Sequence, residues 1–264
     1  SGVAVITLLL GVVGYYGSVQ SEKSIDSVGL QRLPSVDNLS IISNSAEKVK
    51  TVQRTLMNLD NDAMVRARQF DNLKTIRETY ETAWKKYEAL QMTSRQQQIW
   101  SQFEPAWQAW RAENDKFMQL IKQYDDLGIA NSTRLVGMGE TIKAGHFEVA
   151  EHVHDAIGSG ETFEGGEDHT GCALGKFAAT YKTTNPVIQT ALAEVAEPHR
   201  QFHQAVKEIK QLAVSGQKDE AEQVRVQKLK PAQAKVVACI NALNAEAAKA
   251  DAIYKGAYVQ MMEG

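Results

Sequence analysis

The sequence has few of the features that build β-structure or a disulfide scaffold. Its 264 residues include two cysteines and five prolines. Alternating β-branched runs and Asn-Gly turns are absent, which excludes a sheet. Two cysteines are too few for a disulfide network. Acidic and basic residues are interspersed and the formal net charge is −3, so the composition also excludes an evident nucleic-acid-binding surface.

Helical periodicity is the dominant signal that remains. Apolar residues recur every three or four positions in several long segments, which is typical of helices that bury one face. The clearest series is Trp100, Phe103, Trp107, Trp110, Asn114, Phe117, Ile121 and Tyr124. Asn114 interrupts this stripe as a register-setting polar residue does. The sequence therefore predicts an all-α protein, an elongated antiparallel helical bundle.

The N-terminus carries the one long uncharged apolar run. It reads GVAVITLLLGVVGYYG over residues 2–17 and ends in Tyr15 and Tyr16. We interpret residues 1–18 as a truncated transmembrane helix with both tyrosines at the interface. A signal-peptide core is the alternative. On this interpretation the following residues lie on the outer side of the membrane.

All six histidines fall between residues 146 and 203, together with one cysteine in the stretch DHTGCALGKF. His199 and His203 are four residues apart and share one helix face, so both imidazoles can reach one ion. His146 lies on an apolar helical stripe. Histidines that face inward require polar partners, and such a cluster is typical of a metal site.

Three histidines and Cys172 make a set of four nitrogen and sulfur ligands, which is the tetrahedral set that zinc accepts. Copper and nickel also bind these donors. His152, His154 and His169 are alternatives to His146. A disulfide between Cys172 and Cys239 is a further alternative, and it would remove the thiolate ligand.

The blocks His146-x-x-Val149, Cys172-Ala-Leu-Gly-Lys-Phe177 and His199-x-x-x-His203 resemble the chemoreceptor zinc-binding domain. This resemblance implies zinc as the cofactor, with His146, Cys172, His199 and His203 as its ligands. The family is associated with zinc and with the sensing of reactive chlorine through this cysteine, so the resemblance also implies a redox-sensing role for Cys172.

The remaining sequence resembles the four-helix-bundle ligand-binding domain of methyl-accepting chemotaxis proteins. The apolar N-terminus, the long helix, the segment WSQFEPAWQAWRAENDKF and a returning helix carry this resemblance. We expect four segments: a transmembrane helix at 1–18, sensor helices at 19–127, a zinc-binding helical insert at 128–216 and a returning helix at 217–264.

Together these observations predict the extracytoplasmic sensory domain of a bacterial chemoreceptor-type transmembrane receptor. We expect it in the inner membrane with a periplasmic sensor portion, as a homodimer, connected to a cytoplasmic signalling module after the C-terminus. It would signal by metal occupancy or by the redox state of Cys172. In the alternative, zinc is purely structural and the bundle senses a small molecule, for which Arg54, Arg66 and Arg68 could bind an anion.

An enzymatic function is not predicted. His199 is followed by Arg200, so the pair lacks the glutamate that a His-Glu-x-x-His helix uses as a base. Four protein ligands also leave no open position for an activated water. A c-type haem is excluded because the chain has no Cys-x-x-Cys-His motif.

Overall fold

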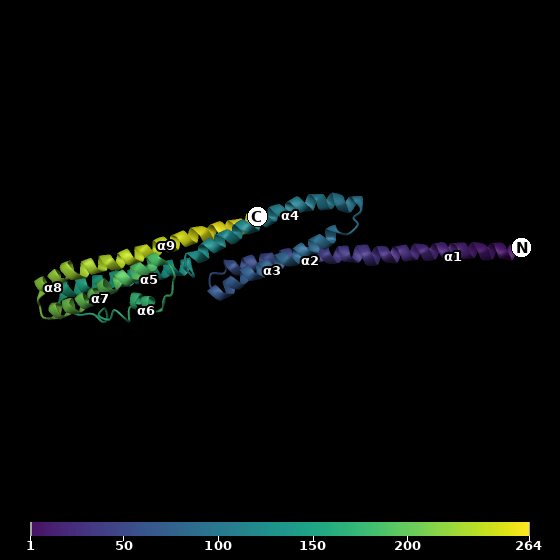
Figure 1. Cartoon of the computed structure of the whole chain (residues 1–264). Coiled ribbons are helices and arrows are strands. Elements are labelled where there is room, and N and C mark those ends of the chain that lie inside the picture. Colours follow the sequence, from purple (N-terminus) through teal and green to yellow (C-terminus); the bar gives the residue numbers. More distant parts are fainter. Residues whose placement is uncertain (1, 264) are drawn as a thin grey trace. The chain divides into compact units, whose positions relative to one another are not determined.

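The structure is a computed structural model that describes the backbone from Gly2 to Glu263 and the side chains from Leu8 to Glu263. All regular structure in this described part is helical (Figure 1). The elements in chain order are α1 (Gly2–Ser27), the π-helical turn η1 (Val28–Arg32), α2 (Leu33–Met57), α3 (Ala63–Glu88), α4 (Ser94–Asp126), α5 (Ser132–Ser159), α6 (Ala173–Thr180), α7 (Pro186–Val214), α8 (Lys218–Val224), the π-helical turn η2 (Arg225–Leu229) and α9 (Lys230–Glu263). The predicted all-α class is confirmed.

The chain divides into two compact units, one that ends at Ala112 and one that begins at Glu113. In the first unit α2 lies along α3 (Figure 1). Aromatic side chains join α3 to the first half of α4. The ring centroids of Tyr80 and Trp107 are 5.1 Å apart, and those of Tyr87 and Trp100 are 4.5 Å apart. The part of the predicted aromatic stripe from Trp100 to Trp110 is therefore a packing surface in this unit.

Arg66, one of the three arginines that could bind an anion, instead contributes to packing within the first unit. The Arg66 side chain is buried and donates a hydrogen bond from Nη1 to the carbonyl oxygen of Leu56 at the end of α2. It therefore satisfies a carbonyl that has no partner within its own helix. Asp62 caps the start of α3 by accepting a 2.8 Å hydrogen bond from the Val65 amide.

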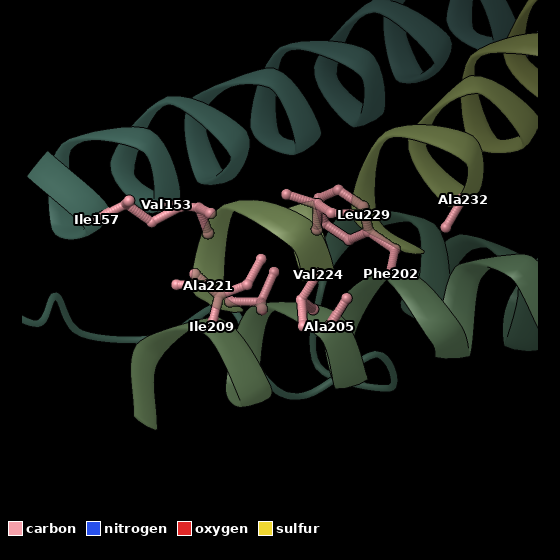
Figure 2. Close-up of a cluster of buried hydrophobic side chains, with 10 residues drawn as sticks. Val153, Ile157, Phe202, Ala205, Ile209, Ala221, Val224, Leu229 and Ala232 are labelled. Atoms are coloured by element: carbon pink, nitrogen blue, oxygen red, sulfur yellow. The ribbon is translucent and has the colours of Figure 1, made fainter. Parts of the chain in front are cut away.

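In the second unit α5, α7 and α9 lie side by side (Figure 1). A cluster of buried apolar side chains fills the space between α5, α7, α8 and the start of α9 (Figure 2). Its members are Val153, Ile157, Phe202, Ala205, Val206, Ile209, Ala221, Val224, Leu229 and Ala232. Burial of these side chains is the main favourable term that holds the three long helices together.

Local sequence signals fix the ends of the helices that carry the histidines. Asn131 caps α5 by accepting a hydrogen bond from the Arg134 amide, and α5 ends at Ser159, followed by the C-cap Gly160, whose φ is +78°. Asn185 caps α7, which begins at Pro186. The Asn185 amide also donates to the Glu246 carboxylate at 3.0 Å, so the start of α7 is tied to α9.

The structure does not support the predicted transmembrane helix at residues 1–18. None of the helices in the described part of the chain is long and apolar enough to cross a bilayer. The first seven side chains of the predicted span lie outside the described residues. The predicted inner-membrane location and the predicted periplasmic, extracytoplasmic sensor both depended on this span. Without a span in the described residues, both predictions are corrected here.

Candidate metal centre

Four side chains from three elements of the second unit come together at one point. His146 of α5, Cys172 at the start of α6, and His199 and His203 of α7 each present one ligand atom, and these atoms all lie within 4.8 Å of one another. The three imidazoles are buried, and the Cys172 side chain is partly exposed. The structure therefore brings together the same four residues that the sequence selected.

The His146 ring is oriented by its own helix. Its Nδ1 lies 2.7 Å from the carbonyl oxygen of Ile142, one turn earlier in α5. A carbonyl oxygen only accepts, so Nδ1 carries the proton and Nε2 carries a lone pair. Nε2 is fully buried, with no hydrogen-bond partner among the described residues. An unsatisfied buried nitrogen that faces other donors has the position expected of a metal ligand.

His203 is oriented in the same way, but by a loop. Its Nδ1 lies 2.7 Å from the carbonyl oxygen of Gly166, in the loop between α5 and α6. Its Nε2 lies 3.1 Å from Nε2 of His199. The two histidines therefore direct their Nε2 atoms to the same point from successive turns of α7.

Cys172 is the N-cap residue of α6. Its Sγ accepts a hydrogen bond from the Gly175 amide at 3.4 Å and lies 3.1 Å from Nε2 of His199. Both cysteines are free, so the disulfide alternative is not formed. Cys239 is buried on α9, where burial raises the pKa of its thiol to about 11. The one cysteine beside the histidines is thus Cys172.

Glycine is required three residues after Cys172. A Cβ on Gly175 would lie 2.1 Å from the carbonyl oxygen of His169 and 2.8 Å from that of Thr170. The loop backbone therefore packs directly on the first turn of α6. This close approach fixes the position of Cys172 relative to the loop.

The three histidines remain uncharged at neutral pH. Burial is the largest cause that lowers the pKa of His146, and it also lowers the pKa of His203. For His199, burial and then the neighbouring His203 and His146 lower the pKa to about 3. Neutral imidazoles keep the lone pairs that a metal ion needs.

Lys210 fixes the loop that orients His203, and the sequence analysis did not identify it. The buried ammonium donates to the carbonyl oxygen of Gly165 at 3.0 Å and forms an ion pair with Glu167. Gly165 and Glu167 flank Gly166, whose carbonyl accepts the His203 proton. Its spacing in the sequence could have indicated this role, because a lysine seven residues after His203 lies on the same buried helix face.

The other histidines lie outside this group. His152 and His154 are exposed on α5, and the His152 ring contacts Phe163 at 5.3 Å between centroids. The His169 ring is partly buried at the edge of the group, 6.1 Å from the His199 ring. Neither His152 nor His154 therefore takes the position predicted for His146.

The residues present fit a zinc ion. Three neutral imidazole nitrogens and one cysteine sulfur form a four-ligand set that zinc accepts. The Nδ1–H groups of His146 and His203 donate to backbone carbonyls, as the non-ligating nitrogens of metal-binding histidines do.

Comparison with known protein families gives two matches. Residues 2–130 match the four helix bundle sensory module for signal transduction. Residues 146–210 match the chemoreceptor zinc-binding domain, and this range contains all four ligand-bearing residues and Lys210. The chain is thus similar to these two modules over two separate ranges. No curated protein and no solved structure gives a significant match.

Zinc is therefore the cofactor of the chemoreceptor zinc-binding domain in this chain. Chemotaxis and signal transduction are the functional context of both modules. Such modules are typically non-enzymatic. The predicted resemblance to the two families is confirmed.

Proposed function

We propose that His146, Cys172, His199 and His203 bind one zinc ion, and that this site is the regulatory input of a chemoreceptor-type signalling protein. The observation that supports the proposal is the convergence of four ligand atoms within 4.8 Å from three helices. Zinc would act as a Lewis acid that all four residues coordinate. Because the ligands come from α5, α6 and α7, the state of the site sets how these helices pack against one another.

The second part of the proposal is that Cys172 responds to oxidants. Its side chain is partly exposed, whereas the three histidines are buried. A peroxide can therefore reach the sulfur without displacing α5 or α7. The thiolate attacks one peroxide oxygen, the O–O bond breaks, and hydroxide leaves. The sulfur loses two electrons and becomes a sulfenic acid, a weaker ligand.

Metal content of the purified protein tests the zinc site. We expect about one zinc per chain, measured by inductively coupled plasma mass spectrometry, in the wild-type protein. We expect substoichiometric zinc in His203→Ala after dialysis against a mild chelator. His154→Ala is the matched control, since His154 is an exposed histidine outside the group. Equal zinc in all three proteins, or none in the wild type, would reject the proposed site.

A second arm separates a regulatory zinc site from a purely structural one. The zinc-loaded protein is treated with hydrogen peroxide, and the protection of α6 amides is followed by hydrogen exchange. Regulation predicts faster exchange in α6 after oxidation and recovery with a reductant. Unchanged exchange while Cys172 is oxidised would show that the site only stabilises the fold.

A further inference from the structure

A fourth histidine lies at the edge of the proposed zinc site without belonging to the ligand set. The centroids of the ligand rings are 4.8 Å apart for His199 and His203, and 5.6 Å apart for His146 and His203. The His169 ring is 6.1 Å from the His199 ring. Its distance from a ligand ring therefore exceeds the largest ring spacing within the set by 0.5 Å, which is the difference between 6.1 and 5.6 Å.

The backbone of His169 is coupled to Cys172. The Cys172 thiol donates to the carbonyl oxygen of His169 at 3.5 Å, and this oxygen also packs on Gly175. The carbonyl oxygen of His169 is thus bonded to one proposed ligand, Cys172, while its ring lies 6.1 Å from the ring of another, His199.

We propose that His169 is a reserve ligand, which takes the fourth position at the zinc ion when the Cys172 thiolate is lost. This inference rests on the proposed function of the same site. The exchange replaces one sulfur by one imidazole nitrogen and gives a site with four nitrogen ligands, a set that zinc also accepts. The ion would stay bound while the link between zinc and α6 is broken.

The neighbouring carboxylate is a weaker candidate for the same position. Asp168 Oδ1 already accepts hydrogen bonds from the Thr170 amide at 2.8 Å and from the Thr170 hydroxyl at 2.7 Å. These bonds hold the Asp168–Gly171 turn in place. His169, in the middle of this turn, has an imidazole that lies toward His199.

The test is a double-mutant cycle on zinc affinity, measured by competition with a chromophoric chelator. Cys172→Ser removes the thiolate and keeps a side chain that caps a helix, so α6 is retained. We expect His169→Ala alone to change the affinity less than threefold. In the Cys172→Ser background, we expect His169→Ala to weaken zinc binding by more than about tenfold. His152→Ala in the same background is the control, and we expect no further loss.

Cobalt substitution gives an independent readout of the same exchange. Cys172→Ser should lose the thiolate-to-cobalt charge-transfer band but keep the strong visible bands of a tetrahedral ion, since His169 fills the fourth position. In the double variant water takes the fourth position, so its visible spectrum should become pH-dependent as this water ionises, whereas the spectrum of Cys172→Ser should not. Equal effects of His169→Ala in both backgrounds would overturn the inference while the wild-type site still binds zinc. Absence of zinc from the wild type would instead overturn the proposed function.

Discussion

The Nε2 atoms of His199 and His203 lie 3.1 Å apart on successive turns of α7. His203 donates its Nδ1 proton to Gly166, so its Nε2 lone pair is directed at this point by one loop carbonyl. The position of a ligand atom on a rigid helix therefore depends on how firmly the loop between α5 and α6 is held.

Lys210 is expected to act on zinc binding through the loop. Lys210→Met removes the hydrogen bond to Gly165 and the ion pair with Glu167, so the Gly166 carbonyl no longer holds the His203 ring. We expect zinc affinity to fall by about 10-fold to 100-fold. Competition titration with a chelator measures the change, and the charge-transfer band of the cobalt protein should shift with it.

Lys207→Met is the matched control for Lys210. Lys207 is an exposed lysine on the same helix. Its substitution should leave zinc affinity unchanged. If both variants bound zinc as tightly as the wild type, the loop would have no part in orienting His203.

The pH dependence of stability should report the buried histidines of the metal-free protein. Their pKa values are lowered on folding, so below about pH 6.5 the unfolded chain binds more protons than the folded one. The contribution of these neutral histidines to the free energy of unfolding is therefore fully present above this pH and is lost as the pH falls. Each histidine contributes a slope of up to about 1.4 kcal/mol per pH unit.

Urea unfolding of chelator-treated protein between pH 5 and pH 8 measures this slope. His199→Gln should make it shallower, because the pKa of His199 is lowered to about 3. His154→Gln, at an exposed position, should leave the slope as in the wild type. A slope that His199→Gln does not change would contradict the assignment of His199 as a buried neutral imidazole.

Gly175→Ala should damage both stability and zinc binding. The new methyl group would lie 2.1 Å from the His169 carbonyl oxygen, so the loop or the first turn of α6 must move and displace Cys172. We expect the free energy of unfolding to fall by about 1–3 kcal/mol. Gly137→Ala on α5 is the control. It has open space around its Cβ and should raise stability by about 0.5–1 kcal/mol.

Arg66 should contribute to the stability of the first unit rather than to anion binding. Arg66→Met leaves the Leu56 carbonyl without its hydrogen bond and should lower the free energy of unfolding by about 1–3 kcal/mol. The exposed Arg68 gives the control, and Arg68→Met should have little effect. The reverse order of the two effects in thermal unfolding would contradict a structural role for Arg66.

Much of the site could be predicted from helical spacing alone. Four-residue spacing places His199 and His203 on one face, and the apolar stripe of α5 directs His146 inward. The approach of Cys172 to His199 depends on the path of the loop, which no local periodicity encodes. Cys172 was included in the predicted set because it lies among the histidines in the sequence, and the family resemblance implied the same ligand. The roles of Lys210 and Gly166 depend on the same path and were missed.

The main error arose from composition at the N-terminus. An uncharged apolar run was interpreted as a membrane span, whereas the described part of the chain contains no helix that is long and apolar enough for one. The described side chains from Leu8 onward are apolar and exposed as far as Tyr16, and the polar residues that follow end the stretch. The division of the chain into four segments stays a prediction.

X-ray absorption spectroscopy at the zinc edge tests the central claim most directly. In the purified wild-type protein, the account predicts a four-coordinate ion with one sulfur at about 2.3 Å and three nitrogens at about 2.0–2.1 Å. In Cys172→Ser it predicts a shell of nitrogen donors without sulfur. A wild-type shell that lacks sulfur, or that contains fewer than three imidazole nitrogens, would contradict the proposed site.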